Sequence, residues 1–498
     1  MSDGITSALP GSDDVIAAIA TASGRGALAM IRVSGAAAFE VVGRVVRPWP
    51  TEPRRATLAR VIDPAGGDVV DQAMVVAYSA PATYTGEPLV ELTTHGGVAA
   101  PAAVLAALVA AGAREARPGE FTRRAVLNGK LDLLQAEAVA DMIDARSGAM
   151  RRAALAQLDG ALSRRVHALR DALLDVEALL AYDIDFPEED DGPVPRGRVR
   201  SACARAMTGI DALLATAGAG ELAREGALVV IAGPPNAGKS SLFNALLGRQ
   251  RALVTPVPGT TRDAIEATMD IGTWPVRLVD TAGLRETSDM VERLGIEVSA
   301  RYLAAAELVL ACGETDDAVH HGASVVRGMT EAAVMAVRTK TDLVGAAGHA
   351  APHAAAANDS ARAAGGPPQH QHGTGHADLH HPSTAARIES QPLRVSAERG
   401  DGLGDLVAAI EATLSARRGA MVADGETPLV TRARHRRALD EAREELGAFT
   451  HAWDEDQLPA PVAAVHLRSA VHALESLVGT MDVEDVLGRL FSTFCVGK

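Results

Sequence analysis

The segment Gly233-Pro234-Pro235-Asn236-Ala237-Gly238-Lys239-Ser240 constrains the fold more than any other part of the sequence. It follows the apolar run Ala227 to Ala232 and precedes leucines at helical spacing, among them Leu242 and Leu246. Glycines between a strand and a helix let backbone N–H groups approach a phosphate, and the helix N-terminus adds a favourable dipole. The segment therefore predicts a phosphate-binding loop in an α/β domain. An ordinary glycine-rich turn is the alternative, which the flanking strand and helix disfavour.

The pattern of apolar residues changes along the 498 residues of the sequence. Residues 15–120 carry short apolar runs separated by Gly and Pro, which is typical of mixed α/β structure. Residues 130–217, and again 428 to the end, carry apolar residues three and four apart, as in the stripe from Leu155 to Leu180, which predicts an amphipathic helix. Strands and helices alternate over residues 226–416, which predicts a doubly wound, mostly parallel sheet. We therefore expect an α/β and all-α multidomain protein, with the α/β domain inserted into a helical one.

These changes place the domain boundaries. We expect an N-terminal α/β domain at 1–128, a helical domain in two parts at 129–222 and 419–498, and the inserted domain at 223–418. Residues 345–390 are rich in Ala, Gly, Pro and His and are predicted to be disordered, because they have little apolar surface to bury. Their seven histidines could bind a metal loosely, but a solvated loop is favoured because the spacing fits no ligand pattern.

Composition limits the function classes. The net charge of −15 argues against RNA binding through bulk positive potential, so any RNA must meet a local patch. The three cysteines, Cys203, Cys312 and Cys495, are odd in number and far apart, which fits a reducing compartment. No apolar run approaches the ~20 residues that span a bilayer, and the first thirty residues show no export signal. We therefore expect a cytoplasmic protein without a membrane span.

Lysine is scarce: the 48 basic residues include only Lys130, Lys239, Lys340 and Lys498. An ammonium is a compact point charge, whereas arginine presents a planar fork. Each lysine is therefore a candidate for a site that needs an ammonium.

Four further segments follow the phosphate-binding loop in the order that a nucleotide switch requires. Lys239 would reach the β and γ phosphates, and Ser240 with Thr261 would supply hydroxyl ligands to Mg²⁺. Asp280-Thr281-Ala282-Gly283 ends an apolar strand, placing a carboxylate near the metal and a glycine beside the γ-phosphate. Asp342 follows a second strand and would accept hydrogen bonds from guanine, while Ser396-Ala397-Glu398 would offer a backbone donor to the guanine carbonyl.

Together these segments predict a GTPase. The predicted nucleotide site comprises Asn236, Ala237, Gly238, Lys239, Ser240, Ser241, Thr255, Pro256, Val257, Pro258, Gly259, Thr260, Thr261, Asp280, Thr281, Ala282, Gly283, Thr339, Lys340, Asp342, Ser396, Ala397 and Glu398.

Motifs outside the nucleotide site give the chain a closer resemblance. They are Tyr84-Thr85-Gly86-Glu87, His95-Gly96-Gly97, Arg117-Pro118-Gly119-Glu120-Phe121-Thr122, Leu127-Asn128-Gly129-Lys130-Leu131-Asp132-Leu133, Gln135-Ala136-Glu137-Ala138 and Phe494-Cys495-Val496-Gly497-Lys498. With these, nearly the whole chain apart from the His-rich insert resembles the tRNA uridine-5-carboxymethylaminomethyl modification GTPases known as MnmE or TrmE.

The resemblance implies a function. Such proteins use GTP hydrolysis, with an FAD-containing partner (MnmG or GidA), to add a carboxymethylaminomethyl or aminomethyl group to C5 of the wobble uridine of certain tRNAs. The carbon comes from 5,10-methylene-tetrahydrofolate, for which 5-formyl-tetrahydrofolate is an analogue. The resemblance also implies a homodimer and a heterotetramer with the partner. It assigns folate binding in the N-terminal domain to Arg32, Glu91, Lys130 and Lys498.

The resemblance also implies potassium-dependent hydrolysis, with two nucleotide domains dimerising around K⁺. The potassium ligands would be the Asn236 side chain and loop oxygens of Thr255, Val257 and Thr260. Leu284 stands where other GTPases carry the glutamine that orients water, and a leucine cannot polarise water. The resemblance assigns that role to Glu292, acting directly or through a second water.

At two positions the sequence departs from the family pattern, so the roles of the family's residues cannot be carried over there unchanged. Thr339 stands where the guanine motif usually begins with asparagine, which ties loops together and contacts the base. Threonine is shorter and has no amide, which predicts lower affinity for guanine. Thr93 replaces the first histidine of a His-Gly-His-Gly-Gly segment. Cys495 is either a thiol that acts in one-carbon transfer or a buried small apolar residue.

Other interpretations stay open at this point. A ribosome-assembly GTPase would carry a basic appendage, which the sequence does not show, and a folate-binding module could have a merely structural nucleotide site. A basic cluster could either face tRNA or form a solvated helix face; its members are Arg432, Arg434, His435, Arg436 and Arg437.

Overall fold

The computed structural model describes residues 14–22, 24–185, 196–249, 265–272, 274–281, 301–344, 391–418, 428–454, 460–479 and 497. The chain divides into two compact units. Unit 1 consists of Met1–Ala145, Arg152–Ala217 and Gly425–Lys498, and unit 2 of Arg146–Arg151 and Gly218–Asp424. Unit 2 therefore interrupts unit 1 in the sequence.

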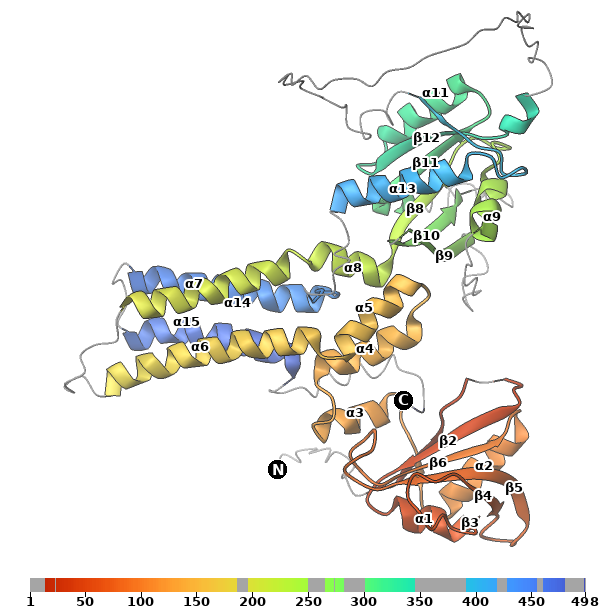
Figure 1. Ribbon diagram of the computed structural model, residues 1–498, viewed down its shortest axis with the longest axis vertical. Coiled ribbons are helices and arrows are strands. Elements are labelled where there is room, and N and C mark those ends of the chain that lie inside the picture. Colours follow the sequence, from red (N-terminus) through yellow and green to blue (C-terminus); the bar gives the residue numbers. More distant parts are fainter. Residues whose placement is uncertain are drawn as a thin grey trace, which may run out of the picture. The chain divides into compact units, whose positions relative to one another are not determined.

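Unit 1 begins with a seven-stranded sheet of order β3-β4-β5-β6-β2-β1-β7 (Figure 1). Neighbouring strands are antiparallel except β1 and β7, which are parallel. The helices α1 and α2 pack against residues such as Ile31, Val75 and Leu92, which alternate along their strands with more exposed residues. This period of two gives the sheet one apolar face. The elements are β1 Ile16–Ile19, β2 Leu28–Ser34, α1 Ala38–Val45, β3 Val46–Arg47, β4 Thr57–Ile62, β5 Val69–Tyr78, β6 Leu89–His95, α2 Ala99–Ala110 and β7 Arg114–Glu115.

In the part of the chain that is described, the rest of unit 1 is mainly helical. The helices α6, α7, α14 and α15 lie side by side (Figure 1) and share one core, to which Leu173, Ile210, Leu446 and Leu474 contribute. Two of these helices precede unit 2 in the sequence and two follow it, so the predicted helical domain with an inserted domain is confirmed. The helices that involve unit 1 are α3 Glu120–Leu127, α4 Leu133–Asp144, α5 Gly148–Leu158, α6 Ala161–Asp185, α7 Arg196–Leu214, α14 Ala433–Asp454 and α15 Ala460–Val478.

The single helix predicted from the stripe Leu155 to Leu180 is wrong. The helix α5 ends at Leu158 and α6 begins at Ala161. Gly160, between them, has φ +78, and left-handed glycine is a common way to end a helix. Leu155 is 40% exposed, so the buried part of the stripe begins in α6.

Unit 2 contains a six-stranded sheet of order β13-β12-β11-β8-β10-β9, in which only β9 runs antiparallel to its neighbour. Alternate residues of β8 enter different cores: Val229 packs with Leu242 of α9 and Leu406 of α13, whereas Val230 packs with Val326 of α11. Helices therefore cover both faces, and the predicted doubly wound sheet is confirmed. The elements are α8 Ala217–Glu225, β8 Ala227–Ala232, α9 Lys239–Arg249, β9 Ile265–Ile271, β10 Trp274–Asp280, β11 Leu308–Gly313, α11 Asp316–Arg327, β12 Ala333–Arg338, the 3₁₀ helix η2 Thr341–Val344, β13 Leu393–Arg394 and α13 Leu403–Arg418.

Some predicted features fall outside the described residues. They are Thr255 to Thr261, Ala282, Gly283, Leu284, Glu292, the insert 345–390 with its histidines, Cys495 and Lys498. Within the part of the chain that is described, no helix has the length and apolar character needed to cross a membrane.

Candidate functional site

The predicted phosphate-binding loop joins β8 to α9. Gly233 has φ +154, and a Cβ atom there would lie 2.4 Å from the Cys312 carbonyl oxygen at the end of β11, so the position requires glycine. Asn236 is left-handed as well, with φ +65. Lys239 is only 6% exposed, and its Nζ donates a hydrogen bond to the Pro234 carbonyl oxygen at 2.8 Å. The ammonium therefore lies inside the loop, where a phosphate would need it.

Ser240 and Asp280 meet beside this loop. The Ser240 hydroxyl donates to Oδ2 of Asp280 at 2.6 Å, and Asp280 is fully buried. Asp280 pairs with Ile231 in the parallel register of β10 and β8. Asp280 therefore lies at the carboxyl end of β10, next to the carboxyl end of β8, which is where α/β proteins bind ligands. A hydroxyl and a carboxylate are oxygen ligands of the kind that Mg²⁺ prefers. The two residues therefore fit the predicted magnesium site.

Thr339, the departure from the guanine motif, fastens two loops. It is 4% exposed, and its Oγ1 lies 2.7 Å from the Ala237 carbonyl oxygen and 3.1 Å from that of Gly313. The hydroxyl has one hydrogen to share between these acceptors. The hydroxyl therefore ties the end of β12 to the phosphate-binding loop, which is the loop-tying part of the role expected of asparagine.

The predicted guanine-binding residues lie together at the ends of β12 and β13. Ser396 Oγ donates to Oδ1 of Asp342 at 2.8 Å, and Arg399 Nη2 donates to the Asp342 carbonyl oxygen at 2.7 Å. The Ser396 hydrogen bond lowers the pKa of Asp342 below its ordinary value. An ionised carboxylate accepts hydrogen bonds only, which suits the two N–H donors of guanine. Lys340 is held by Glu314, with Nζ 2.5 Å from Oε1.

The structure pairs two of the predicted folate residues. Arg32 of β2 and Glu91 of β6 are register partners, and Arg32 donates to Glu91 Oε1 from Nε at 3.1 Å and from Nη2 at 2.8 Å. The guanidinium also lies over the rings of Tyr84 and Phe121, at 5.2 and 5.8 Å from their centroids. Tyr78 Oη donates to Glu91 Oε2 at 3.3 Å. Aromatic rings and a charged pair therefore form a partly buried polar site on this face of the sheet.

Lys130 and the chain terminus reach the same domain. Lys130 Nζ donates to the Pro81 carbonyl oxygen at 3.2 Å, and its stem lies against Gly86, two residues after Tyr84. Gly497 is buried, and a Cβ atom on it would lie 2.6 Å from the Ile19 carbonyl oxygen of β1. Because β1 pairs with β2, the residue before Lys498 lies one strand away from Arg32. The folate roles of these residues stay predictions.

Sequence reasoning missed several residues of these sites. Glu314 contacts Lys340 and Arg399 contacts Asp342 only because the chain folds in this way. Their spacing in the sequence does not indicate these contacts. The sequence predicts only a backbone role for Ser396, whereas its hydroxyl also donates a hydrogen bond to Asp342. Tyr84 and Phe121 stand within the motifs that carry the family resemblance, so those motifs could have identified them.

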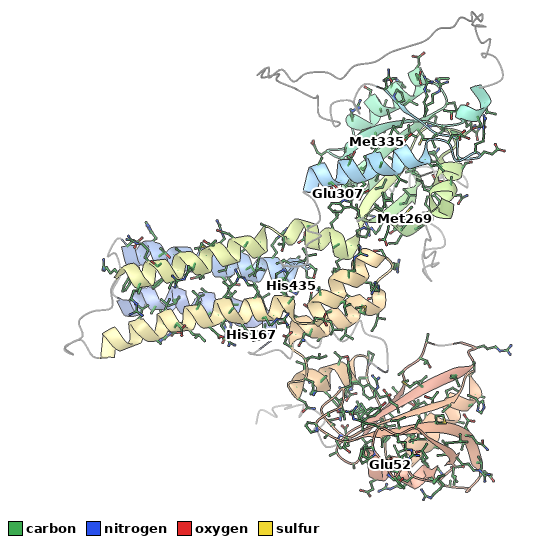
Figure 2. All side chains as sticks on the ribbon, in the orientation of Figure 1. Glu52, His167, Met269, Glu307, Met335 and His435 are labelled. Carbon is green, nitrogen blue, oxygen red and sulfur yellow. The ribbon has the colours of Figure 1, made fainter. Side chains whose placement is uncertain are left out.

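The basic cluster at the start of α14 differs in the structure from both interpretations of the sequence. Neither a tRNA-facing patch nor a solvated face describes Arg432, Arg434 and His435, because these residues point into unit 1. His435 is fully buried, with Nε2 2.6 Å from Oε2 of Glu137 in α4 (Figure 2 shows His435 among the bundle helices). Arg434 also binds Glu137, and Arg432 Nη2 donates to Asp141 at 2.7 Å. Only Arg436 and Arg437 are exposed.

This buried cluster predicts acid sensitivity. Burial lowers the pKa of His435 below its ordinary 6.5, so the unfolded chain binds a proton that the folded chain excludes. Stability is therefore expected to fall as pH drops below 6.5, with a limiting slope of about 1.4 kcal/mol per pH unit from this residue. Glu137, whose pKa is lowered from 4.5 to about 2, loses its contribution only below pH 4.5.

The measurement is the urea-unfolding midpoint between pH 7 and 5, for the wild type and for His435→Gln, which keeps an N–H donor. The variant should show the shallower dependence. Parallel pH profiles would contradict the assignment.

Comparisons with known proteins agree with this architecture. The family model of the GTP-binding protein TrmE N-terminus matches residues 15–130, and that of the MnmE helical domain matches residues 133–495. The tRNA modification GTPase MnmE of Moorella thermoacetica is 40% identical over 493 residues, covering 98% of this chain and 100% of that protein. The protein of the same name from Azoarcus sp. is 41% identical over 498 residues, covering 99% and 100%.

Among solved structures, the G domain of the T. maritima FeoB iron transporter matches with a TM-score of 0.24 and 20% identity, covering 38% of this chain and 98% of that one. A likeness this low does not bear on function. The two family models and the nearly full-length relatives settle the family. The chain belongs to the tRNA modification GTPase MnmE family.

Proposed function

We propose that this GTPase is potassium-dependent and acts with an FAD-containing partner, MnmG, on the wobble uridine of certain tRNAs. The product carries a carboxymethylaminomethyl or aminomethyl group at C5, and 5,10-methylene-tetrahydrofolate donates the carbon. The active species would be a homodimer, in a heterotetramer with the partner. The observation that carries the proposal is the juxtaposition of Lys239, Ser240 and the buried Asp280 in a chain of this family.

Different residues of unit 2 would bind the phosphates, the guanine base, Mg²⁺ and the attacking water. Lys239 would bind the β and γ phosphates, exchanging the Pro234 carbonyl for phosphate oxygens, and Asp342 would bind the guanine edge. Ser240 and Asp280 would hold Mg²⁺, which neutralises phosphate charge when bound. Glu292 would orient the water that attacks the γ-phosphorus, giving GDP and phosphate.

Asn236 fits the proposed potassium site by its chemistry. Its side chain is exposed on the loop and carries an amide oxygen, a suitable neutral ligand for K⁺. Together with loop oxygens of Thr255, Val257 and Thr260, it would hold the ion. A bound K⁺ would supply positive charge near the transferring phosphoryl group.

The N-terminal sheet offers a separate site for the folate. The folate heterocycle carries both hydrogen-bond donors and acceptors. The guanidinium of Arg32 would donate to it, and the carboxylate of Glu91 would accept from it. Tyr84 and Phe121 supply aromatic surface beside this pair. The ammonium groups of Lys130 and Lys498 suit the carboxylates of a glutamate tail.

The potassium dependence can be tested directly. GTP hydrolysis is expected to be several-fold or more faster in K⁺ than in Na⁺ at equal ionic strength, because only an ion of the right size fits the proposed ligands. In Asn236→Ala the two salts should give the same rate. Steady-state phosphate release measures both, and equal wild-type rates in the two salts would overturn the proposed potassium site.

Base selection should depend on Asp342. Asp342→Asn exchanges one carboxylate oxygen for an amide donor, so the variant is expected to lose GTP affinity by roughly ten- to a hundredfold and to prefer xanthine nucleotides. Competition binding with GTP, XTP and ATP measures this. The assignment fails if ATP competes as well as GTP for the wild-type protein.

A further inference from the structure

A small apolar core lies on the face of the N-terminal sheet opposite α1 and α2, and its buried members are Ile16, Ala18, Ala116 and Phe121. Along β1 the side chains alternate: Ala17 enters the core beneath α1 and α2, whereas Ala18 packs in the small core with Phe121 of α3. Tyr84 packs against the same small core. Because Ala18 is the register partner of Arg32, this core lies beside the guanidinium of Arg32.

The phenol of Tyr84 is held by α3. Tyr84 Oη and Thr122 Oγ1 share a hydrogen bond at 2.8 Å, and Thr122 is fully buried. Burial raises the pKa of the Tyr84 phenol, and a phenol in such surroundings usually has a hydrogen-bond partner. Phe121, the residue before Thr122, contributes the second ring that lies over Arg32. One turn of α3 therefore carries one of the two rings and holds the other.

The loop that carries this phenol is joined to α3 at further points. Asn128 Nδ2 donates to the Thr85 carbonyl oxygen at 2.7 Å. Arg124 of α3 binds Glu87, with Nη1 3.2 Å from Oε2. Ser34 Oγ of β2 donates to the same oxygen of Glu87 at 2.9 Å. Glu87 therefore joins the loop both to α3 and to β2.

The guanidinium of Arg32 is held on one edge and over two aromatic faces. Glu91 Oε1 accepts from its Nε and from its Nη2, whereas Nη1 makes no hydrogen bond to another described residue. A cation is attracted to the face of an aromatic ring, so the rings limit the positions that the guanidinium can take. The position of Nη1, the nitrogen left for a ligand, therefore depends on where the rings lie.

We propose that Thr122 and Glu87 are positioning residues for the folate site. Thr122 holds the phenol of Tyr84 directly, and Glu87 holds the loop that carries this ring on α3 and β2. The ring is thereby kept over the guanidinium of Arg32, which it limits to one position for contact with the pteridine ring. The effect on folate binding rests on the proposed function; the effect on the position of Tyr84 does not.

The first test observes Tyr84 in the full-length protein. The chain has four tyrosines, so protein labelled with 3-fluorotyrosine gives few fluorine NMR resonances, and the one lost in Tyr84→Phe belongs to Tyr84. Thr122→Val, which keeps the shape and removes the hydroxyl, and Glu87→Gln, which removes the charge, should each shift this resonance by more than its linewidth. The matched control is Thr94→Val, which removes a buried hydroxyl that donates to the Ala29 carbonyl oxygen at 3.3 Å, and it should leave the resonance unchanged.

Glu87→Gln is the decisive variant of this test. The ion pair of Glu87 is with Arg124, whereas the phenol is bound by Thr122, so a shift in Glu87→Gln reports movement of the ring and not the loss of its own hydrogen bond. This variant also serves if Thr122→Val fails to fold.

The second test measures the binding of 5-formyl-tetrahydrofolate to unlabelled protein by calorimetric titration. Thr122→Val and Glu87→Gln should each weaken binding by about fivefold or more, which is the size of effect expected when one hydrogen bond is lost. Thr122→Ser restores the hydroxyl and should restore the wild-type affinity, and Thr94→Val should bind as the wild type does. GTP turnover should stay within about twofold in all of these variants.

Folded Thr122→Val and Glu87→Gln with the wild-type Tyr84 resonance would overturn the inference. Wild-type folate affinity in variants whose Tyr84 resonance has moved would overturn it as well. If the wild type does not bind the folate, the proposed folate function fails, and the Tyr84 resonance alone decides whether Thr122 and Glu87 position the ring.

Discussion

GTP turnover is expected to fall by ~10² or more in Glu292→Ala, while the affinity for GTP stays nearly intact. The reason lies in the sequence after Gly283: Leu284 occupies the position at which other GTPases carry a water-orienting glutamine. If Glu292 replaces that glutamine, it acts on the attacking water and makes no contact with bound GTP in the ground state. Single-turnover hydrolysis together with a binding titration separates the two effects.

Lys239→Met is the matched control for this experiment. The ammonium is buried in the phosphate-binding loop, where it would contact GTP before and during hydrolysis. Lys239→Met should therefore lose affinity and turnover together. If Glu292→Ala loses them in the same proportion, Glu292 is a binding residue and another group orients the water.

The nucleotide-binding unit was predictable because its chemistry is local in sequence. The strand Ala227–Ala232, the loop after it and the helix from Lys239 follow from adjacent residues, and the strand ending at Asp280 follows from its apolar run. A parallel sheet then brings the carboxyl ends of its strands to one edge, so Ser240 and Asp280 could be expected to meet there.

The helical part was less predictable because its contacts join residues that are far apart in the sequence. Glu137 and Arg434 are separated by 297 positions, and no local pattern indicates that two chain segments will pack with a carboxylate facing a guanidinium. A run of basic residues at the start of a helix is most often solvated, so the sequence offers for this cluster only a solvated face or a tRNA-facing patch, and not a buried ionic network. The break between α5 and α6 was missed because a spacing of three and four continues across Gly160, where the backbone conformation, and not the apolar pattern, ends the helix.

Thr339 shows a limit of reading a motif by residue identity. Relative to the family pattern, Thr339 lacks the side-chain amide of asparagine. In the fold, the short hydroxyl still reaches the Ala237 carbonyl, because β12 ends against the phosphate-binding loop. The loop-fastening role therefore survives the substitution, and any loss of guanine affinity must come from the base contact.

Deleting residues 494–498 is expected to abolish folate binding and tRNA modification while leaving GTP hydrolysis unchanged. The reason is the packing of the terminus: Gly497 has φ +97, and a Cβ atom on it would lie 2.6 Å from the Ile19 carbonyl oxygen and 2.8 Å from Ala20 Cα. The chain therefore returns to β1, whose residue Ala18 pairs with Arg32. The deletion removes this contact together with Lys498. Folate titration, phosphate release and analysis of tRNA nucleosides measure the three outcomes.

Two single substitutions separate the causes of that loss. Gly497→Ala places a methyl group against β1 and should weaken folate binding although Lys498 is still present. Cys495→Ser should leave folate binding intact and abolish modification if the thiol takes part in one-carbon transfer, because a hydroxyl is a far weaker nucleophile. Normal modification by Cys495→Ser would assign that cysteine a structural role, and folate binding by the truncated protein would show that the terminus does not complete the site.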